Sequence, residues 1–287
     1  MDKYQEALSK FKPVGSETQI KEEVDKILRI YEQKNFTVDI LKFLHACIDV
    51  TSLSTTDTKE SIWKLVNNVN DFEGLHPDIP NVAAICTYPI FTETVKQALT
   101  AQDVKIAAVA GGFPSSQTFG EVKIAETALA VMHGADEIDT VLNIGLLLEE
   151  NYQELAEDIQ EIKASAHEST LKVILETGAL KSAENIQRAA IFSIYSGADF
   201  IKTSTGKEYE GTTPESVYTM CQVIKQYYEI TERQIGIKIS GGVKKAEDAV
   251  RYYSIVKNIL GEKWLDKAYF RIGSSHLATD IINRIGE

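Results

Sequence analysis

Short apolar segments alternate along the chain with longer segments in which apolar residues recur at helical spacing. The apolar segments have the length and composition of buried strands, and we predict eight of them, separated by amphipathic helices. Alternation of this kind over about 250 residues predicts a single α/β domain, a parallel (β/α)8 TIM barrel. The predicted strands are 43–49, 82–87, 106–110, 137–141, 171–176, 200–203, 235–240 and 269–273.

An open, doubly wound sheet is the alternative arrangement of such units. It requires a glycine-rich turn after the first strand, and residues 49–53 contain no glycine. The chain also has no linker or low-complexity segment that would divide it into two domains. The closed barrel is therefore the preferred fold.

The chain before the first strand predicts helix. Ser16 and Gln19 have the spacing of a capping box, and an apolar helical face follows over residues 20–31. We expect residues 1–40 to form an N-terminal helical extension packed on the barrel, and residues 41–287 to form the barrel. Other helices are expected to begin near Asp57, at Thr213-Pro214 and at Lys245.

The composition narrows the class of protein. Asp and Glu number 42 against 30 Lys and Arg, and the net charge of −12 argues against nucleic acid or an anionic membrane as partner. Neither an apolar signal segment nor a run of about 18 apolar residues occurs. Cys47, Cys86 and Cys221 are odd in number and widely spaced, which predicts neither disulfides nor a metal site. We expect a soluble, cytoplasmic protein.

Two predicted strands carry a lysine near their C-terminal end, where an apolar residue would normally continue the strand. They are Lys202 in the sixth strand and Lys238 in the seventh. The structural explanation for either is a side chain whose amine reaches solvent at the mouth of the fold. If the two strands are neighbours, ammonium groups about 5–6 Å apart repel each other, which lowers the pKa of one. A neutral amine in a dry pocket can form a Schiff base with a carbonyl substrate.

Polar residues also occur at the ends of other predicted strands, where a TIM barrel carries its active site. Singly, each has a structural explanation: Asp49 and Asp139 as caps, Cys86 as a small core residue, and Glu176 as an ion-pair partner at the barrel mouth. Together with Thr51 they converge on one mouth. Asp139 would face the lysine pair, where a carboxylate can carry a proton to and from an amine.

Glycine-rich turns follow the last two predicted strands, at Gly241-Gly242 and at 273–275. In a TIM barrel these loops commonly hold phosphate through backbone N–H groups and hydroxyls. Gly206 and Lys207 could add a donor and a positive charge. An ordinary turn is the alternative explanation for a Gly-Gly pair, so the sequence leaves phosphate binding open.

Several segments together resemble the deoxyribose-phosphate aldolase family of Schiff-base (class I) aldolases. The resemblance implies a TIM barrel and reversible cleavage of 2-deoxy-D-ribose 5-phosphate to D-glyceraldehyde 3-phosphate and acetaldehyde, in deoxynucleoside catabolism. It implies neither a metal nor an organic cofactor. The matching segments are 84–89, 134–139, 171–178, 200–207, 241–243 and 246–249.

The resemblance also assigns roles to residues. It implies that Lys202 forms the Schiff base and that Asp139 and Lys238 transfer protons beside it. Three residues are implied in the substrate pocket: Asp49, Thr51 and Cys86. Five are implied around the phosphate: Gly206, Lys207, Gly241, Gly242 and Ser275.

The chain departs from the family pattern at two places. His276 stands where members often have a second serine, and residues 284–287 lack the C-terminal tyrosine of some members. A Schiff-base aldolase for another phosphorylated sugar and a non-catalytic phosphosugar-binding barrel remain as alternatives. The expected partners are small phosphosugars and aldehydes, and a homodimer is a reasonable assembly.

Overall fold

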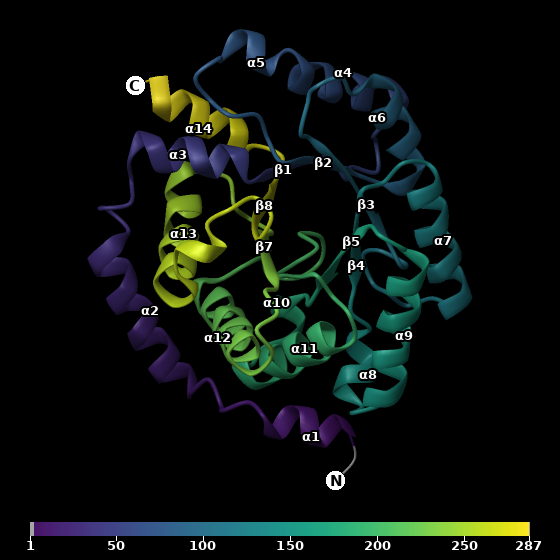
Figure 1. Cartoon of the computed structure of the whole chain (residues 1–287), viewed down its shortest axis with the longest axis vertical. Helices are drawn as coiled ribbons and strands as arrows, with labels where there is room; N and C mark the ends of the chain where they lie inside the picture. The colour runs from purple at the N-terminus through teal and green to yellow at the C-terminus, as the bar shows by residue number, and fades with distance from the viewer. Residues whose placement is uncertain (1–2, 287) are drawn as a thin grey trace.

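The computed structural model describes residues 3–286 and shows a closed barrel of eight parallel strands (Figure 1). Each strand pairs with the next, and β1 pairs with β8 to close the sheet. The predicted TIM barrel is confirmed. The strands are β1 (Ile48–Thr51), β2 (Ala84–Thr87), β3 (Lys105–Ala110), β4 (Glu137–Val141), β5 (Thr170–Ile174), β6 (Phe200–Lys202), β7 (Gly236–Ser240) and β8 (Phe270–Ser274).

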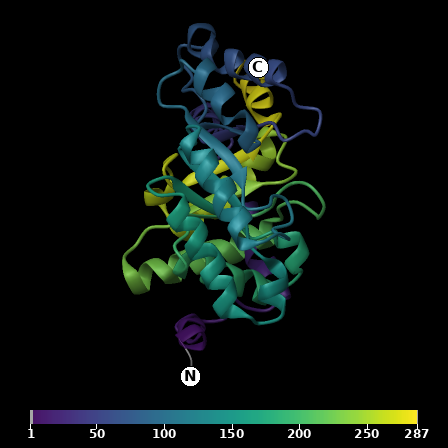
Figure 2. The ribbon, with the colours of Figure 1, turned by 90° about the vertical axis from the view of Figure 1, so that its right-hand side faces the viewer.

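Helices surround the barrel, as the side view also shows (Figure 2). Those before β1 are α1 (Lys3–Ser9), α2 (Glu17–Tyr31) and α3 (Val38–Ala46). Between β1 and β5 lie α4 (Lys59–Asn70), α5 (Phe72–Leu75), η1 (Pro89–Phe91), α6 (Thr92–Ala98), α7 (Gly120–Met132), α8 (Ile144–Leu148) and α9 (Tyr152–Ser165). The rest are α10 (Thr177–Leu180), α11 (Ala183–Tyr195), α12 (Pro214–Thr231), α13 (Ala246–Leu260), η2 (Glu262–Trp264) and α14 (Leu277–Gly286).

Helix α2 begins at the predicted capping box: Ser16 Oγ accepts from the N–H of Gln19, whose side chain accepts from the N–H of Ser16. Its apolar face packs against α12 and α13, outside the barrel (Figure 1). The backbone of Lys12 is also bound by the Gln187 and Gln226 side chains. The segment before α3 thus contacts the barrel's helices over much of its length.

The predicted first strand was wrong at its start, because residues 43–46 belong to α3. The Thr37 side chain caps this helix by accepting from the N–H of Ile40, and Leu41 and Leu44 are buried at helical spacing. The local cap and the spacing of three decide the conformation there. Helix α3 also crosses the expected boundary at residue 40.

Helix α4 begins one residue later than Asp57 suggests. Thr58 and Ser61 form its capping box. The Asp57 carboxylate instead accepts from Ser52 Oγ and from the N–H of Ser54, within the β1–α4 loop. A carboxylate before a helix can therefore serve the loop while a neighbouring threonine serves the helix.

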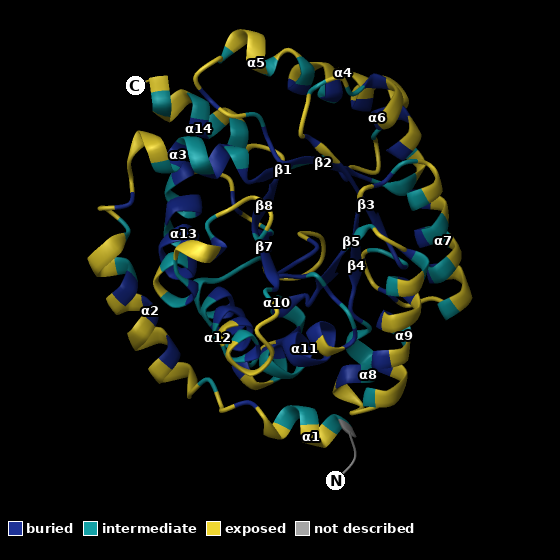
Figure 3. Cartoon of the chain, viewed as in Figure 1, coloured by how far each residue is buried: buried dark blue, intermediate teal, exposed yellow. Residues whose placement is uncertain are grey.

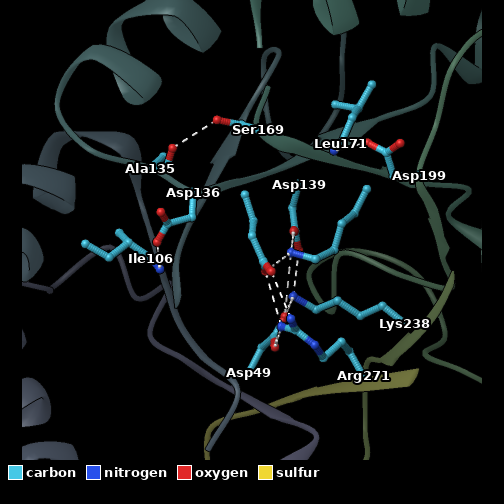
Figure 4. Close-up of polar contacts among 12 residues, drawn as sticks. Asp49, Ile106, Ala135, Asp136, Asp139, Ser169, Leu171, Asp199, Lys238 and Arg271 are labelled. Atoms are coloured by element: carbon cyan, nitrogen blue, oxygen red, sulfur yellow. Dashed lines mark hydrogen bonds and ion pairs between the residues drawn. The ribbon is translucent and has the colours of Figure 1, made fainter. Parts of the chain in front are cut away.

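A Gly-Ala-Asp triplet precedes both β4 and β6, and its aspartate binds the backbone of the preceding strand at the N-terminal end of the barrel. Asp136 Oδ2 accepts from the N–H of Ile106 at 2.9 Å, and Asp199 Oδ2 accepts from the N–H of Leu171 at 2.9 Å (Figure 4). Both pairs lie at the end of the sheet opposite the C-terminal strand ends. They show that this end of the barrel is held by fixed carboxylate–backbone contacts.

Burial follows the two layers of the fold, with buried residues on the strands and on the helix faces that cover them (Figure 3). The main apolar core lies between the sheet and the helices. The barrel interior differs, because two of the largest fully buried side chains, Lys172 and Lys238, lie there and are charged. Within residues 3–286, no helix is long and apolar enough to cross a membrane.

Candidate active site

A cavity of about 350 Å³ opens at the C-terminal ends of the strands. It is lined by residues from the loops after β1, β6, β7 and β8. Seven of the predicted site residues belong to this lining: Thr51, Lys202, Gly206, Lys207, Gly241, Gly242 and Ser275. The other four predicted residues, Asp49, Cys86, Asp139 and Lys238, do not line the cavity and are fully buried.

Lys202 and Lys238 lie directly opposite each other on the neighbouring strands β6 and β7. Both Nζ atoms donate to Oδ2 of Asp139, Lys202 at 2.7 Å and Lys238 at 2.8 Å. Figure 4 shows Asp139 and Lys238 facing each other inside the barrel. The structure thus brings the three predicted catalytic residues together around one carboxylate oxygen.

Three further charged residues, which were not predicted from the sequence, belong to the same network. Lys172 Nζ on β5 donates to Asp139 Oδ1 at 3.0 Å and to Glu137 Oε2 at 2.5 Å. Arg271 on β8 donates to Glu137 Oε1 at 2.9 Å and to Asp49 Oδ1 at 2.7 Å. Charged residues inside otherwise apolar strands were the available signal for all three.

Asp49 belongs to this ionic layer below the cavity. Its Oδ2 forms an ion pair of 2.5 Å with Lys238, while its Oδ1 accepts from Arg271 (Figure 4). Thr51, two residues on, reaches the cavity wall, and its Oγ1 donates to the Asp49 carbonyl. Asp49 therefore holds the lysine and arginine in place from beneath the cavity.

The surroundings shift the pKa of the two central lysines in opposite directions. Burial lowers the pKa of Lys202; the Asp139 carboxylate opposes this shift and the Lys238 charge reinforces it. Burial also disfavours the charge on Lys238, but Asp139 and Asp49 outweigh it and raise its pKa. Repulsion between the lysines, expected from the sequence, is therefore secondary to desolvation at Lys202.

A charge count agrees with this difference between the lysines. Three carboxylates (Asp49, Glu137 and Asp139) face four cations (Lys172, Lys202, Lys238 and Arg271) in the ionic layer. Loss of one proton makes the layer neutral. Lys202 contacts one carboxylate, whereas Lys238 contacts two. The charged form of Lys202 is therefore stabilised less than that of Lys238.

Cys86 belongs to a small apolar cluster with Leu53, Ala84, Ala107 and Val109 on the β1–β3 side of the barrel. Burial raises the pKa of its thiol, so the neutral thiol is the stable form. All three cysteines are buried and free. Among residues 3–286, no group of three His, Cys, Asp or Glu side chains is placed to hold a metal ion.

The glycine-rich loops line the part of the cavity expected to hold phosphate. Gly241 and Gly242 both have positive φ, at 92° and 86°. Ser275 Oγ forms a hydrogen bond of 2.7 Å with Nδ1 of His276. The Lys207 side chain donates to the Leu53 carbonyl across the cavity mouth.

Two backbone donors near this loop are already engaged. The N–H of Gly206 donates to Ser204 Oγ, and that of Lys207 donates to Thr205 Oγ1. Gly206 and Lys207 therefore present the lysine side chain, rather than these N–H groups, to an anion. Glu176 was expected to make an ion pair, but no basic partner of Glu176 occurs in the described chain. Its carboxylate accepts from Ser204 and Thr205 instead.

The comparisons with known proteins agree with this geometry. A family model described as DeoC/LacD family aldolase matches residues 44–256. The chain belongs to that family. The resemblance found in the sequence is thereby confirmed, and the protein is an aldolase, a carbon–carbon lyase.

Relatives of this aldolase cover most of its length. Deoxyribose-phosphate aldolase from Bos taurus is 36% identical over 249 residues, covering 83% of this chain and 78% of the relative. The Homo sapiens enzyme of the same name is also 36% identical, over 248 residues, with the same coverage. The deoxyribose phosphate aldolase structure from Aeropyrum pernix matches with a TM-score of 0.68 and 25% identity, covering 95% of this chain and 99% of that one.

Proposed function

We propose that this aldolase cleaves 2-deoxy-D-ribose 5-phosphate reversibly to D-glyceraldehyde 3-phosphate and acetaldehyde through a Schiff base on Lys202. The main support for this proposal is the placement of Lys202: its side chain lines the cavity, its pKa is lowered, and its Nζ contacts Asp139. The names of the bovine and human relatives support the choice of substrate. A role in deoxynucleoside catabolism follows from that substrate.

The chemistry begins with the neutral amine of Lys202, which attacks the C1 aldehyde of the open-chain sugar. Loss of water gives an iminium that withdraws electrons from the adjacent carbon. Removal of the C3 hydroxyl proton then breaks the C2–C3 bond, releases the aldehyde phosphate and leaves an enamine on Lys202. Protonation of C2 and hydrolysis release acetaldehyde and restore the amine. We assign the proton transfers to Asp139, which contacts Lys202, and to Lys238, which contacts the same oxygen of Asp139.

The far end of the cavity is suited to the substrate phosphate. Glycine loops after β7 and β8 offer backbone N–H groups, and Ser275 and Lys207 add a hydroxyl and a positive charge. The positive charge of Lys207 is a local feature, since the chain as a whole is strongly acidic. We assign Gly241, Gly242, Ser275 and Lys207 to the phosphate.

We also propose a cytoplasmic location and a homodimer for this protein. Three buried, free cysteines are consistent with a reducing compartment. The dimer stays a prediction, which the sedimentation coefficient of the purified protein tests. Residues 1–40 are proposed as an extension that stabilises the barrel without contributing to catalysis.

Borohydride trapping tests the Schiff base directly. We expect acetaldehyde or 2-deoxyribose 5-phosphate with borohydride to add a stable adduct to Lys202, located by intact mass and peptide mapping. The Lys202→Met variant should gain no adduct, whereas Lys123→Met, which removes a buried lysine bonded to Asp158 outside the barrel interior, should label normally. An adduct on Lys238 would reverse the assignment of the two lysines. Retro-aldol cleavage of a ketose phosphate in preference to the deoxy sugar would indicate another substrate.

A further inference from the structure

Glu176 is buried and has a conformation that side-chain-bearing residues seldom adopt. Its φ and ψ are 51° and 61°, in the left-handed region, and its side chain is 3% exposed. Neither the proton transfers nor the phosphate contacts proposed above use this carboxylate. A buried residue held in a disfavoured conformation indicates that its surroundings determine its position.

Hydrogen bonds on either side of Glu176 account for the conformation. The N–H of Leu175 donates to the Lys202 carbonyl at 2.8 Å, and the N–H of Thr177 donates to the Thr203 carbonyl at 2.9 Å. Leu175 and Thr177, at the end of β5, therefore pair with two consecutive residues at the end of β6, and Glu176 is the additional residue between them. Its left-handed turn lets it reach the loop that follows Lys202.

The carboxylate bonds to that loop with both oxygens. Ser204 Oγ donates to Oε1 of Glu176 at 2.7 Å, and Thr205 Oγ1 donates to Oε2. The N–H of Thr205 lies 3.3 and 3.4 Å from the two oxygens. No basic side chain within the described residues neutralises the carboxylate, so these hydroxyls and the backbone N–H are its partners.

The same two hydroxyls hold the next part of the loop. Each gives its hydrogen to Glu176, so its lone pairs are free to accept from the N–H groups of Gly206 and Lys207. These bonds are 3.0 and 3.2 Å long. One carboxylate thereby orders four consecutive residues, Ser204 through Lys207.

This loop forms the cavity wall and supports the glycine loop beside it. Thr205, Gly206 and Lys207 line the cavity. Ser204 is in close contact with Gly241, where an added Cβ would lie 3.0 Å from Ser204 Oγ, and the Ser204 carbonyl accepts from Ser240 Oγ. A shift of the Ser204 loop would therefore displace both walls of the phosphate end.

We propose that Glu176 is a positioning residue that holds the Ser204–Lys207 loop in the shape that accepts the phosphorylated end of the substrate. It acts through hydroxyl groups and touches neither the reacting carbons nor the phosphate. The proposal rests on the proposed function for the identity of the ligand. Its structural part, the ordering of the loop, does not depend on that function.

Kinetics of Glu176→Ala and Glu176→Gln test the proposal, with 2-deoxyribose 5-phosphate and unphosphorylated 2-deoxyribose as substrates. Loss of the carboxylate should raise KM for the phosphorylated substrate roughly tenfold or more, because charge-assisted hydrogen bonds order the loop. The preference for the phosphorylated over the unphosphorylated sugar should fall by a similar factor. Glutamine keeps one acceptor oxygen, so Glu176→Gln should restore part of this preference.

Asp199→Asn is the matched control. Asp199 also accepts from a backbone N–H, and from the Lys163 and Arg233 side chains, but it lies at the opposite end of the barrel. It should leave the substrate preference unchanged even if it lowers the thermal midpoint as much as Glu176→Gln does. An equal loss of substrate preference in Asp199→Asn and in the Glu176 variants would mean that Glu176 contributes only to overall stability, which would overturn the proposal. An unchanged preference in Glu176→Ala would also overturn it.

Limited trypsin digestion separates this proposal from the proposed function. Lys207 lies in the ordered loop, so Glu176→Ala should be cut after Lys207 much faster than the wild type or Asp199→Asn. Absence of acetaldehyde labelling in the wild type would defeat the proposed function and leave this readout intact. Equal cutting rates in all three proteins would defeat the role of Glu176, whatever reaction the enzyme catalyses.

Discussion

One oxygen of Asp139 accepts hydrogen bonds from two lysines, and the other oxygen accepts from a third. This sharing matters when Lys202 loses its proton, because Lys172 and Lys238 continue to satisfy the carboxylate. The buried charge of Asp139 is therefore never left alone during turnover. In the proposed reaction this carboxylate exchanges a proton with Lys202.

Replacing Lys238 by Met should shift the pH dependence of Schiff-base formation to higher pH. The charge on Lys238 lowers the pKa of Lys202, so its removal raises that pKa and reduces the neutral fraction at pH 7. We expect the acetaldehyde trapping rate at pH 7 to fall by roughly tenfold and to recover partly as the pH rises toward about 9. The rate of borohydride-trapped adduct formation against pH measures this.

Lys123→Met provides the control for this pH series, since it removes a buried, paired lysine from the α7–α9 contact instead. Its trapping profile should match that of the wild type. A Lys238→Met profile that keeps its wild-type midpoint and only loses amplitude would contradict an electrostatic role and leave Lys238 as a direct proton carrier.

At the scale of elements, periodicity and caps predicted most of the fold. The Ser16 box of α2 and the Thr213-Pro214 start of α12 were confirmed. The start of β1 was wrong because an apolar segment as short as 43–49 fits a helix or a strand, and the cap at Thr37 decides between them.

The site was less predictable than the fold, for a physical reason. Sequence motifs identify Lys202 and Asp139. The arrangement of strands around the barrel decides which other side chains, distant in sequence, come into contact with them. Lys172 meets Asp139 across the neighbouring strands β4 and β5, whereas Arg271 on β8 reaches Glu137 on β4 only because the sheet closes into a barrel. The left-handed turn at Glu176 is likewise set by bonds to β6.

Ser16→Ala tests whether the N-terminal extension folds together with the barrel. The substitution removes the side-chain acceptor of the α2 cap and should cost about 1 kcal/mol of unfolding free energy. If α2 is part of one cooperative unit, the single urea transition shifts to lower concentration while kcat and KM stay unchanged. Thr58→Ala, which removes the comparable cap of α4, should behave alike. A separate early transition in Ser16→Ala would show that α2 unfolds independently.

For the whole molecule, the buried ionic layer sets a pH window of stability. Asp139 has a lowered pKa, so its contribution is present above about pH 4 and is lost as the pH falls below that value. Lys238 has a raised pKa, and its contribution is present below about pH 10.4 and lost at higher pH. Lys202 acts in the opposite sense, since its lowered pKa means that the folded state disfavours its charge.

Lys202→Met should therefore stabilise the protein at neutral pH while it abolishes the reaction. The substitution removes the excess cation from a layer of four cations and three carboxylates, which we expect to raise the unfolding free energy by about 1 kcal/mol. The gain should be largest below the folded-state pKa of Lys202. It should vanish near pH 10.5, where the unfolded chain also loses the proton.

Urea unfolding of wild type and Lys202→Met at pH 6 and at pH 10.5 measures this difference. Lys238→Met should lose stability at pH 6, by roughly 1–3 kcal/mol, because Asp49 and Asp139 each lose a charged donor and only Lys238 contacts both of them closely. Opposite signs for the two lysines, at the same depth in neighbouring strands, would show that Lys202 is held at a cost in stability so that its amine can react. Destabilisation by both variants alike would mean that Lys202 is an ordinary member of the ionic layer.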